Sequence, residues 1–301
     1  MSDILDLKTI DDYNRFHGLE TQNPLVSLAD FSKMEKCPHR RMRLGFYAIL
    51  LKEEIYGTLT YGRNKYDYEA GTLVFIAPGQ VIGIDDNGYT PHPQGYGLFF
   101  HPDFIRGTSL SHKMKDYTFF SYEVNEALHM SERERQTVFN CFGEIDEELR
   151  HDLDRHSRSI IVSNIEVLLN NCLRFYDRQF ATRSVLNNDV LTRFHTLLDN
   201  YFSSGKPEES GLPSVAWCAD QLHFSANYFG DMVKKQTGKS AIECIHQAVI
   251  DKVKDLLLET DRTISELAYE TGLKYPQHMT RLFKKRVGCT PKEYRGNAGT
   301  M

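Results

Sequence analysis

The stretch "ISELAYETGLKYPQHMTRLFKKRVG" (264–288) decides the fold of the C-terminal part of this chain. Its apolar residues follow one helical pattern up to Gly272 and a second one after it. Thr263 and Glu266 have the spacing of a capping box, which begins the first helix. Gly288 stands where the second helix would end in the left-handed conformation. The stretch therefore predicts two short helices joined by a tight turn.

Residues 215–238, "VAWCADQLHFSANYFGDMVKKQTG", repeat this pattern. The two copies align with one extra residue in the second turn, where Gly272 takes the place of His223. Between the copies, apolar residues at helical spacing predict a longer helix that ends near Thr260. Two helix-turn-helix units joined by a helix are therefore expected. The aligned pairs include Val215 with Ile264, Ala219 with Ala268, Met232 with Leu282, Lys234 and Lys235 with Lys284 and Lys285, and Gly238 with Gly288.

The second helix of each copy carries side chains suited to DNA. A basic helix face is often only a solvated surface, but in a helix-turn-helix this helix lies in the major groove. Its outward side chains then face base edges, and the flanking basic groups face phosphates. Gln can bond adenine, and Arg can bond guanine, through paired hydrogen bonds. We expect DNA to be bound by Ser225, Ala226, Asn227, Tyr228, Lys234, Lys235, Tyr275, Gln277, His278, Thr280, Arg281, Lys284, Lys285 and Arg286.

Residues from about Val215 to Arg295 resemble the DNA-binding domain of AraC/XylS-type transcription regulators. The resemblance rests on the repeat, the joining helix and the terminal "GCTPKEYR" (288–295), and it covers nearly the last third of the chain. It implies a bacterial-type regulator that places both recognition helices in successive major-groove segments of a promoter. The base-reading positions that it implies in the second unit are Gln277, His278, Thr280 and Arg281.

The first unit departs from the family pattern. Gly230 and Asp231 stand where members of the family often carry a polar or basic pair. An Asp that faces the groove is repelled by phosphates unless it accepts a hydrogen bond from a cytosine amine. Base reading by the first unit would therefore rest on Ala226, Asn227 and Tyr228.

The N-terminal part is rich in short aromatic and β-branched runs separated by Gly and Pro. Such runs are typical of an antiparallel barrel or sandwich. "GTLVFIAPG" (71–79) resembles the strand and turn of cupins, with Thr72 in place of an Asp, and the segment looks like the sensor barrel of the same regulators. The expected fold class is α+β, with a cupin-like antiparallel β-barrel and helices followed by an all-α domain. The runs are 40–62, 71–84 and 94–102.

A metal-dependent barrel enzyme is the alternative class, and its ligand pattern is absent. Metal-binding cupins need several converging N or O ligands, including an H-x-H pair. His92 and His101 are nine positions apart, and His39 is alone. We therefore expect no catalytic residue, no metal and no cofactor. Stoichiometric metal would instead favour a cupin enzyme with a DNA-binding appendage, and equal binding of promoter and random DNA would favour an architectural protein.

The resemblance implies a small-molecule effector for the barrel, with binding residues that the sequence leaves unknown. Four aromatic residues could line such a pocket, although packing in the core is the other interpretation. They are Phe46, Tyr47, Tyr56 and Tyr61.

The segment 131–180 is predicted to be helical, with apolar stripes wider than one exposed helix needs. Part of this surface is expected to pack on the barrel. The remainder, in the stripe over 160–176, is a candidate homodimer interface, unless all of it packs within the chain. The expected partners are double-stranded promoter DNA and a second copy of the chain. RNA polymerase is a further candidate partner.

Charge is unevenly distributed along the 301 residues, whose formal net charge is −5. From Gly211 onward there are 13 Lys+Arg against 10 Asp+Glu, or +3, which leaves 36 − 13 = 23 against 41 − 10 = 31, or −8, before it. The intervening "SSGKPEESGLP" (203–213) has the composition of a linker. The expected organisation is a sensor and dimerisation domain (1–180), a helix and linker (181–212) and a DNA-binding domain (213–301).

Composition also suggests the compartment. No apolar run approaches the roughly 18 residues that span a bilayer, and the N-terminus lacks the order of a secretory signal. The six cysteines form no C-x-x-C pair, so neither a zinc site nor a disulfide framework is indicated. A cytoplasmic location is expected, with no membrane association.

Overall fold

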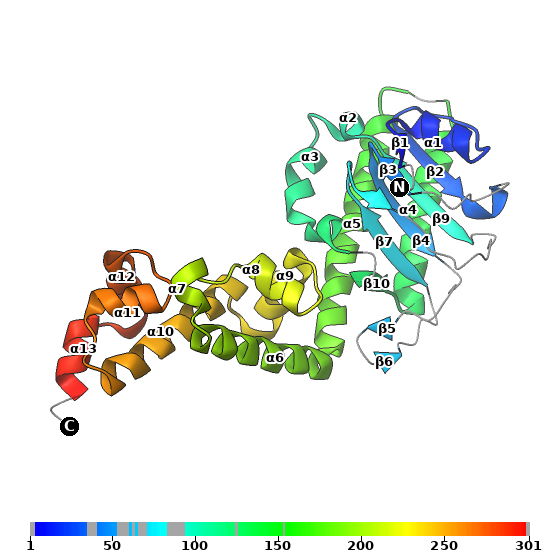
Figure 1. Cartoon of the computed structure of the whole chain (residues 1–301). Coiled ribbons are helices and arrows are strands. Elements are labelled where there is room, and N and C mark those ends of the chain that lie inside the picture. The colour runs from blue at the N-terminus through cyan, green and yellow to red at the C-terminus, as the bar shows by residue number, and fades with distance from the viewer. Residues whose placement is uncertain are drawn as a thin grey trace. The chain divides into compact units, whose positions relative to one another are not determined.

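The computed structural model describes residues 4–34, 41–52, 60–61, 64–65, 71–82, 94–123, 126–152 and 154–298. Two compact units divide the chain after Gln179 (Figure 1). The first unit contains the β-sheets and the second is helical, so the predicted α+β class is confirmed. No helix in the described ranges is long and apolar enough to cross a membrane.

The main sheet of the first unit has five strands in the order β10-β7-β4-β9-β2, and every neighbouring pair is antiparallel. A smaller sheet has the order β1-β3-β8, in which β1 and β3 run parallel, a pairing that the antiparallel prediction did not include. The strands are β1 (Leu5–Leu7), β2 (Val26–Asp30), β3 (Met42–Leu44), β4 (Tyr47–Lys52), β5 (Thr60–Tyr61), β6 (Asn64–Lys65), β7 (Thr72–Ile76), β8 (Val81–Ile82), β9 (Gly95–Phe100) and β10 (Leu128–His129).

Two long helices, α4 and α5, follow the sheets. Ser131 and Glu134 form a capping box that begins α4, because each side chain satisfies a backbone N–H of the first turn. The helical segments of this unit are α1 (Ile10–Phe16), η1 (Phe31–Lys33), α2 (Pro102–Ile105), α3 (Ser109–Lys113), η2 (Met114–Asp116), η3 (Thr118–Ser121), α4 (Glu132–Arg150) and α5 (Ser157–Thr182).

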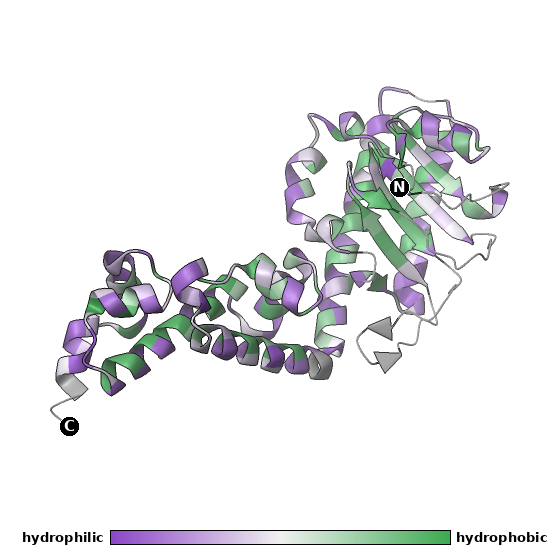
Figure 2. Cartoon of the chain, in the orientation of Figure 1, coloured by the Kyte–Doolittle hydropathy of each residue, from purple (hydrophilic) through white to green (hydrophobic). Residues whose placement is uncertain are grey.

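Aromatic rings fill the space beside the main sheet, and Figure 2 shows β4 and β7 as predominantly hydrophobic. Phe46 is fully buried and packs edge-on against Phe99, so it belongs to the core. Tyr47 stacks on Phe100. The structure therefore favours core packing for these two candidate pocket residues. The other two, Tyr56 and the side chain of Tyr61, lie outside the described residues.

The apolar stripe of α5 is mostly internal to the first unit. Leu169 is fully buried, and the Tyr176 ring stacks on Phe119. The hydroxyl of Tyr176 also donates to the carbonyl of Glu126 at 3.2 Å. Intramolecular packing therefore accounts for this part of the stripe, and a homodimer through the remainder stays a prediction. Ile160 and Val167 remain on the surface, with 42% and 50% exposure.

The second unit contains the predicted pair of helix-turn-helix units, α8–α9 and α11–α12, joined by α10 (Figure 1). The helices are α6 (Ser184–Ser203), α7 (Lys206–Ser210), α8 (Val215–Gln221), α9 (Ala226–Thr237), α10 (Ala241–Glu259), α11 (Ile264–Glu270), α12 (Pro276–Val287) and α13 (Pro291–Ala298).

The segment 203–213 differs from the linker that its composition predicts. It contains α7, and α6 before it packs on α9 and α10 in the same unit. The hydroxyl of Tyr201 donates to the carbonyl of Gly211 at 2.8 Å, which fastens the end of α6 to the segment after α7. Ser, Gly and Pro here begin and end short helices, so composition alone is misleading.

Candidate nucleic-acid interface

The two turns of the helix-turn-helix units share one backbone arrangement. The N–H of Phe224 donates to the carbonyl of Ala219 at 2.9 Å, and that of Leu273 donates to Ala268 at 2.8 Å. Each turn needs a residue with positive φ, and this residue is His223 (64°) in the first unit and Gly272 (80°) in the second. The aligned alanines are fully buried. The repeat seen in the sequence is therefore a structural repeat.

Helix α12 presents a continuous polar face. Pro276 occupies its first turn, where a missing N–H costs no intrahelical bond. Met279 and Phe283 are fully buried and anchor the opposite face. Thr280 is half-buried, and its hydroxyl donates to the carbonyl of Pro276 at 3.0 Å. The exposed residues that the sequence predicted on and beside this helix are Tyr275, Gln277, His278, Arg281, Lys284 and Lys285.

Arg286 lies away from that face. It follows Met279 by seven residues and therefore shares the inward side of α12. Its charge lies near Glu243 and His246 of α10, where burial lowers the pKa of His246 and the nearby guanidinium adds to the effect. Arg286 is only half-exposed, so its contact with DNA stays a prediction that this position favours less than those of Lys284 and Lys285.

Helix α9 presents fewer polar side chains than α12. The Ser225 hydroxyl accepts a hydrogen bond from the N–H of Tyr228 at 3.3 Å, so it caps the helix. Tyr228 is 1% exposed, and its ring lies against Phe224 and Phe180. The prediction that Tyr228 reads bases is therefore wrong, because the aromatic ring supplies core packing. The predicted residues that remain exposed on α9 are Ala226, Asn227, Lys234 and Lys235.

Two basic residues next to these helices were missed by the sequence analysis. Lys274 is exposed in the turn directly before α12, and Lys239 is exposed just after α9. Both stand at helix ends, where chain direction and outward-facing positions are not set by helical periodicity. A search for positive charge in the turns as well as on the helices would have found them.

The terminal "GCTPKEYR" motif supports α12 from behind. Gly288 ends α12 with φ 92°, and Thr290 and Glu293 exchange hydrogen bonds that begin α13. The bonds from the Thr290 backbone and side chain lower the pKa of Glu293. The ring of Tyr294 packs edge-on against Phe283, and Nε of Arg295 donates to the carbonyl of Leu257 at 3.0 Å. The motif is therefore a structural brace for the recognition helix.

The histidines of the sheet region do not converge in the described ranges. Nδ1 of His101 accepts from the N–H of Asp103 at 3.2 Å, so this histidine caps α2. His39 and His92 lie outside the described residues. Within those residues, no group of three or more His, Cys, Asp or Glu side chains could hold a metal ion.

Comparison with known proteins gives one family match. A model described as "Helix-turn-helix domain" matches residues 218–297, which cover both recognition helices. HTH-type transcriptional activator RhaS of Citrobacter koseri is 20% identical over 259 residues, which is 83% of this chain and 85% of RhaS. This chain is a DNA-binding transcription regulator with an AraC-type helix-turn-helix domain in residues 218–297.

Two further similarities each cover about a third of this chain. It is 31% identical over 97 residues to the transcriptional regulatory protein YesN of Bacillus subtilis, a match that covers 31% of the chain and 26% of YesN. The C-terminal domain of AraT, a response regulator from Geobacillus stearothermophilus, is 26% identical, with a TM-score of 0.32 over 36% of this chain and 84% of that domain. The chain therefore spans about a quarter of YesN but most of RhaS.

Proposed function

We propose that this AraC-family regulator binds promoter DNA sequence-specifically, with α12 as the main base-reading helix. The exposed face of Gln277, His278 and Arg281 supports this proposal, because amide and guanidinium groups can form paired hydrogen bonds with base edges. Lys284 and Lys285 are exposed towards the end of the same helix, and we propose that they meet phosphates.

A salt titration of variants on operator and random DNA separates the two roles. Arg281→Ala should cost roughly 1–3 kcal/mol on the operator and much less on random DNA, because phosphate contacts carry no sequence information. Lys284→Gln should weaken both and reduce the slope of log K against log salt by roughly 0.9 for every phosphate that the side chain no longer neutralises. Lys252→Gln on α10, outside the two recognition helices, is the matched control. Equal losses on both DNAs for Arg281→Ala would contradict base reading.

A homodimer is the proposed state on DNA, and the exposed part of α5 is its proposed contact. Ile160 and Val167 are seven residues apart, so they lie on one face of the helix. Val167→Asp should therefore give a folded monomer with weaker binding to a two-site operator. Sedimentation equilibrium measures this, and Asn140→Asp, at an exposed position on α4, is a control for added charge outside the proposed contact. A wild-type monomer at micromolar concentration would exclude the dimer.

We also propose that a small effector or a partner regulates the protein by acting on the N-terminal unit, residues 1–179. No catalytic activity is proposed. His101, which follows β9, is used as a helix cap, which supports a non-catalytic role for it. Metal analysis of the purified protein tests this part. Stoichiometric iron, manganese or zinc would favour an enzyme instead.

A further inference from the structure

The N-terminal unit (residues 1–179) contains a groove between the start of α4 and the last turns of α5. Its volume is about 370 Å³. Small-molecule sites usually measure roughly 300–1,000 Å³, so a ligand of metabolite size fits. The charged and apolar walls are formed by Arg133, Glu134, Asn171, Arg174, Phe175 and Arg178.

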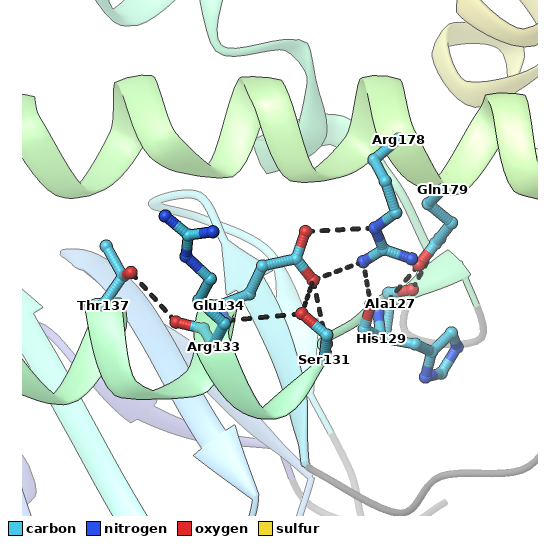
Figure 3. A network of polar contacts seen from close by, with 8 residues as sticks. All are labelled: Ala127, His129, Ser131, Arg133, Glu134, Thr137, Arg178 and Gln179. Carbon is cyan, nitrogen blue, oxygen red and sulfur yellow. Dashed lines mark hydrogen bonds and ion pairs between the residues drawn. The ribbon is translucent and has the colours of Figure 1, made fainter.

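The only carboxylate of this wall, Glu134, is already engaged (Figure 3). Arg178 donates to its two oxygens at 3.0 and 2.7 Å, and the N–H of Ser131 donates to Oε2 at 2.8 Å. Arg178 also donates to the carbonyl of His129 at 2.6 Å. Bidentate Arg–carboxylate pairs hold both partners in one geometry. This pair therefore forms a fixed, electrically neutral end of the groove.

Arg133 and Arg174 leave the groove with a surplus of positive charge. Both are exposed, and no carboxylate among the described residues pairs with either guanidinium. Figure 3 shows the Arg133 side chain reaching from α4 towards α5, apart from the Glu134–Arg178 pair. Three guanidinium groups against one carboxylate give the groove a net charge of +2.

The remaining wall limits the chemistry of a ligand. The Asn171 amide donates to the carbonyl of Val167 at 2.9 Å, so one of its donors is already used. Phe175, 8% exposed, adds an apolar surface. Guanidinium groups match the paired oxygens of carboxylates and phosphates. The available donors therefore favour an anionic group, and the phenyl ring favours a short apolar part next to it.

We infer that this groove binds a small organic anion that carries a carboxylate or a phosphate. A second copy docking groove to groove would set arginines opposite arginines, and like charges across an interface are strongly unfavourable. A small anion instead neutralises Arg133 and Arg174 together. The site is separate from the helix-turn-helix units, so its test needs no DNA.

Isothermal titration of the full chain with phenyl phosphate, benzoate and inorganic phosphate, at constant ionic strength, tests this inference. At least one organic probe should bind saturably. The double variant Arg133→Gln with Arg174→Gln should bind it about tenfold or more weakly, because two charged hydrogen-bond donors are removed. Arg193→Gln, an exposed arginine of α6, should leave binding unchanged. A preference for phenyl phosphate or benzoate identifies the anionic group.

Three results would overturn the inference. They are no saturable binding of any probe, equal binding by the double variant, and binding of a glutamate peptide alone, which would make the groove a docking site for acidic protein segments. Thermal unfolding of the double variant should match that of the wild type, since both arginines are exposed. If it does not, the two single variants replace it.

Discussion

The two helix-turn-helix units have the same backbone turn but depend on different helices to cover their cores. In the first unit, Phe194 of α6 packs edge-on against Phe229 of α9, with ring centroids 5.0 Å apart. In the second, Tyr294 of α13 packs edge-on against Phe283 of α12, at 5.5 Å. A two-helix unit cannot bury its own apolar face, so each copy needs a third helix, and here the third helices come from opposite ends of the domain.

The largest expected difference between the two helix-turn-helix units follows from removing α6, which should destabilise the first of them much more than the second. A fragment of residues 213–301 lacks α6, which exposes Phe229 while α13 still covers Phe283. Removing a buried Phe usually costs about 3–5 kcal/mol, and α6 also contributes the buried Leu198. We expect α8 and α9 to lose hydrogen-exchange protection, whereas α11 and α12 keep most of theirs.

The matched control is a fragment of residues 180–301, which contains α6 and α7 and should protect both units. Exchange measured by mass spectrometry on the two fragments gives the comparison. Equal protection of α9 in both fragments would show that the first unit does not depend on α6.

The turn residues give the next largest difference between the units. Gly272 has φ 80°, and a Cβ there would lie 2.7 Å from the backbone of Gly211. Gly272→Ala should therefore destabilise the domain by about 3 kcal/mol, from left-handed strain and overpacking together. His223→Gly, at the aligned position with φ 64°, should change stability by less than about 1 kcal/mol, because relief of strain opposes the greater freedom of unfolded Gly.

Urea unfolding of residues 180–301 measures both changes. A destabilisation by Gly272→Ala as small as the change at His223 would mean that the Gly211 backbone moves away easily. The close approach of the two glycines would then place little constraint on α11.

The sequence predicted the second helix-turn-helix unit better than the first, for physical reasons. Helical periodicity places Met279 and Phe283 inside and Gln277 and Arg281 outside, and the structure agrees for all four. Helical periodicity could not assign Tyr228 to the core or to the DNA-facing side. A Tyr near the start of a helix suits either position until its neighbours are known.

Those neighbours are remote in the sequence. Tyr228 is covered partly by Phe180, and Tyr176 of α5 stacks on Phe119. Both contacts depend on packing between segments far apart in the chain, which periodicity within one helix does not encode. The same reason explains why the composition of 203–213 indicated a linker, although the segment packs within the helical unit formed by residues 180–301.

The smallest predicted difference concerns two aligned amides, Asn227 and Gln277, which are both exposed near the start of a recognition helix. Either amide can pair with adenine. Their neighbours differ, because Asp231 stands where the second unit has Arg281. A carboxylate near the groove repels phosphates, so the first helix should approach the bases less closely than the second.

Gln277→Ala should therefore cost roughly 1–3 kcal/mol on an operator selected from random DNA, and Asn227→Ala no more than about 0.5 kcal/mol. Fluorescence anisotropy on the operator and on random DNA measures both, and Asn200→Ala, an exposed site on α6, controls for removal of a surface amide. Equal costs would show that the first unit reads bases despite Asp231. That carboxylate would then be expected to accept a hydrogen bond from a cytosine amine, and Asp231→Asn should relax specificity at one base pair.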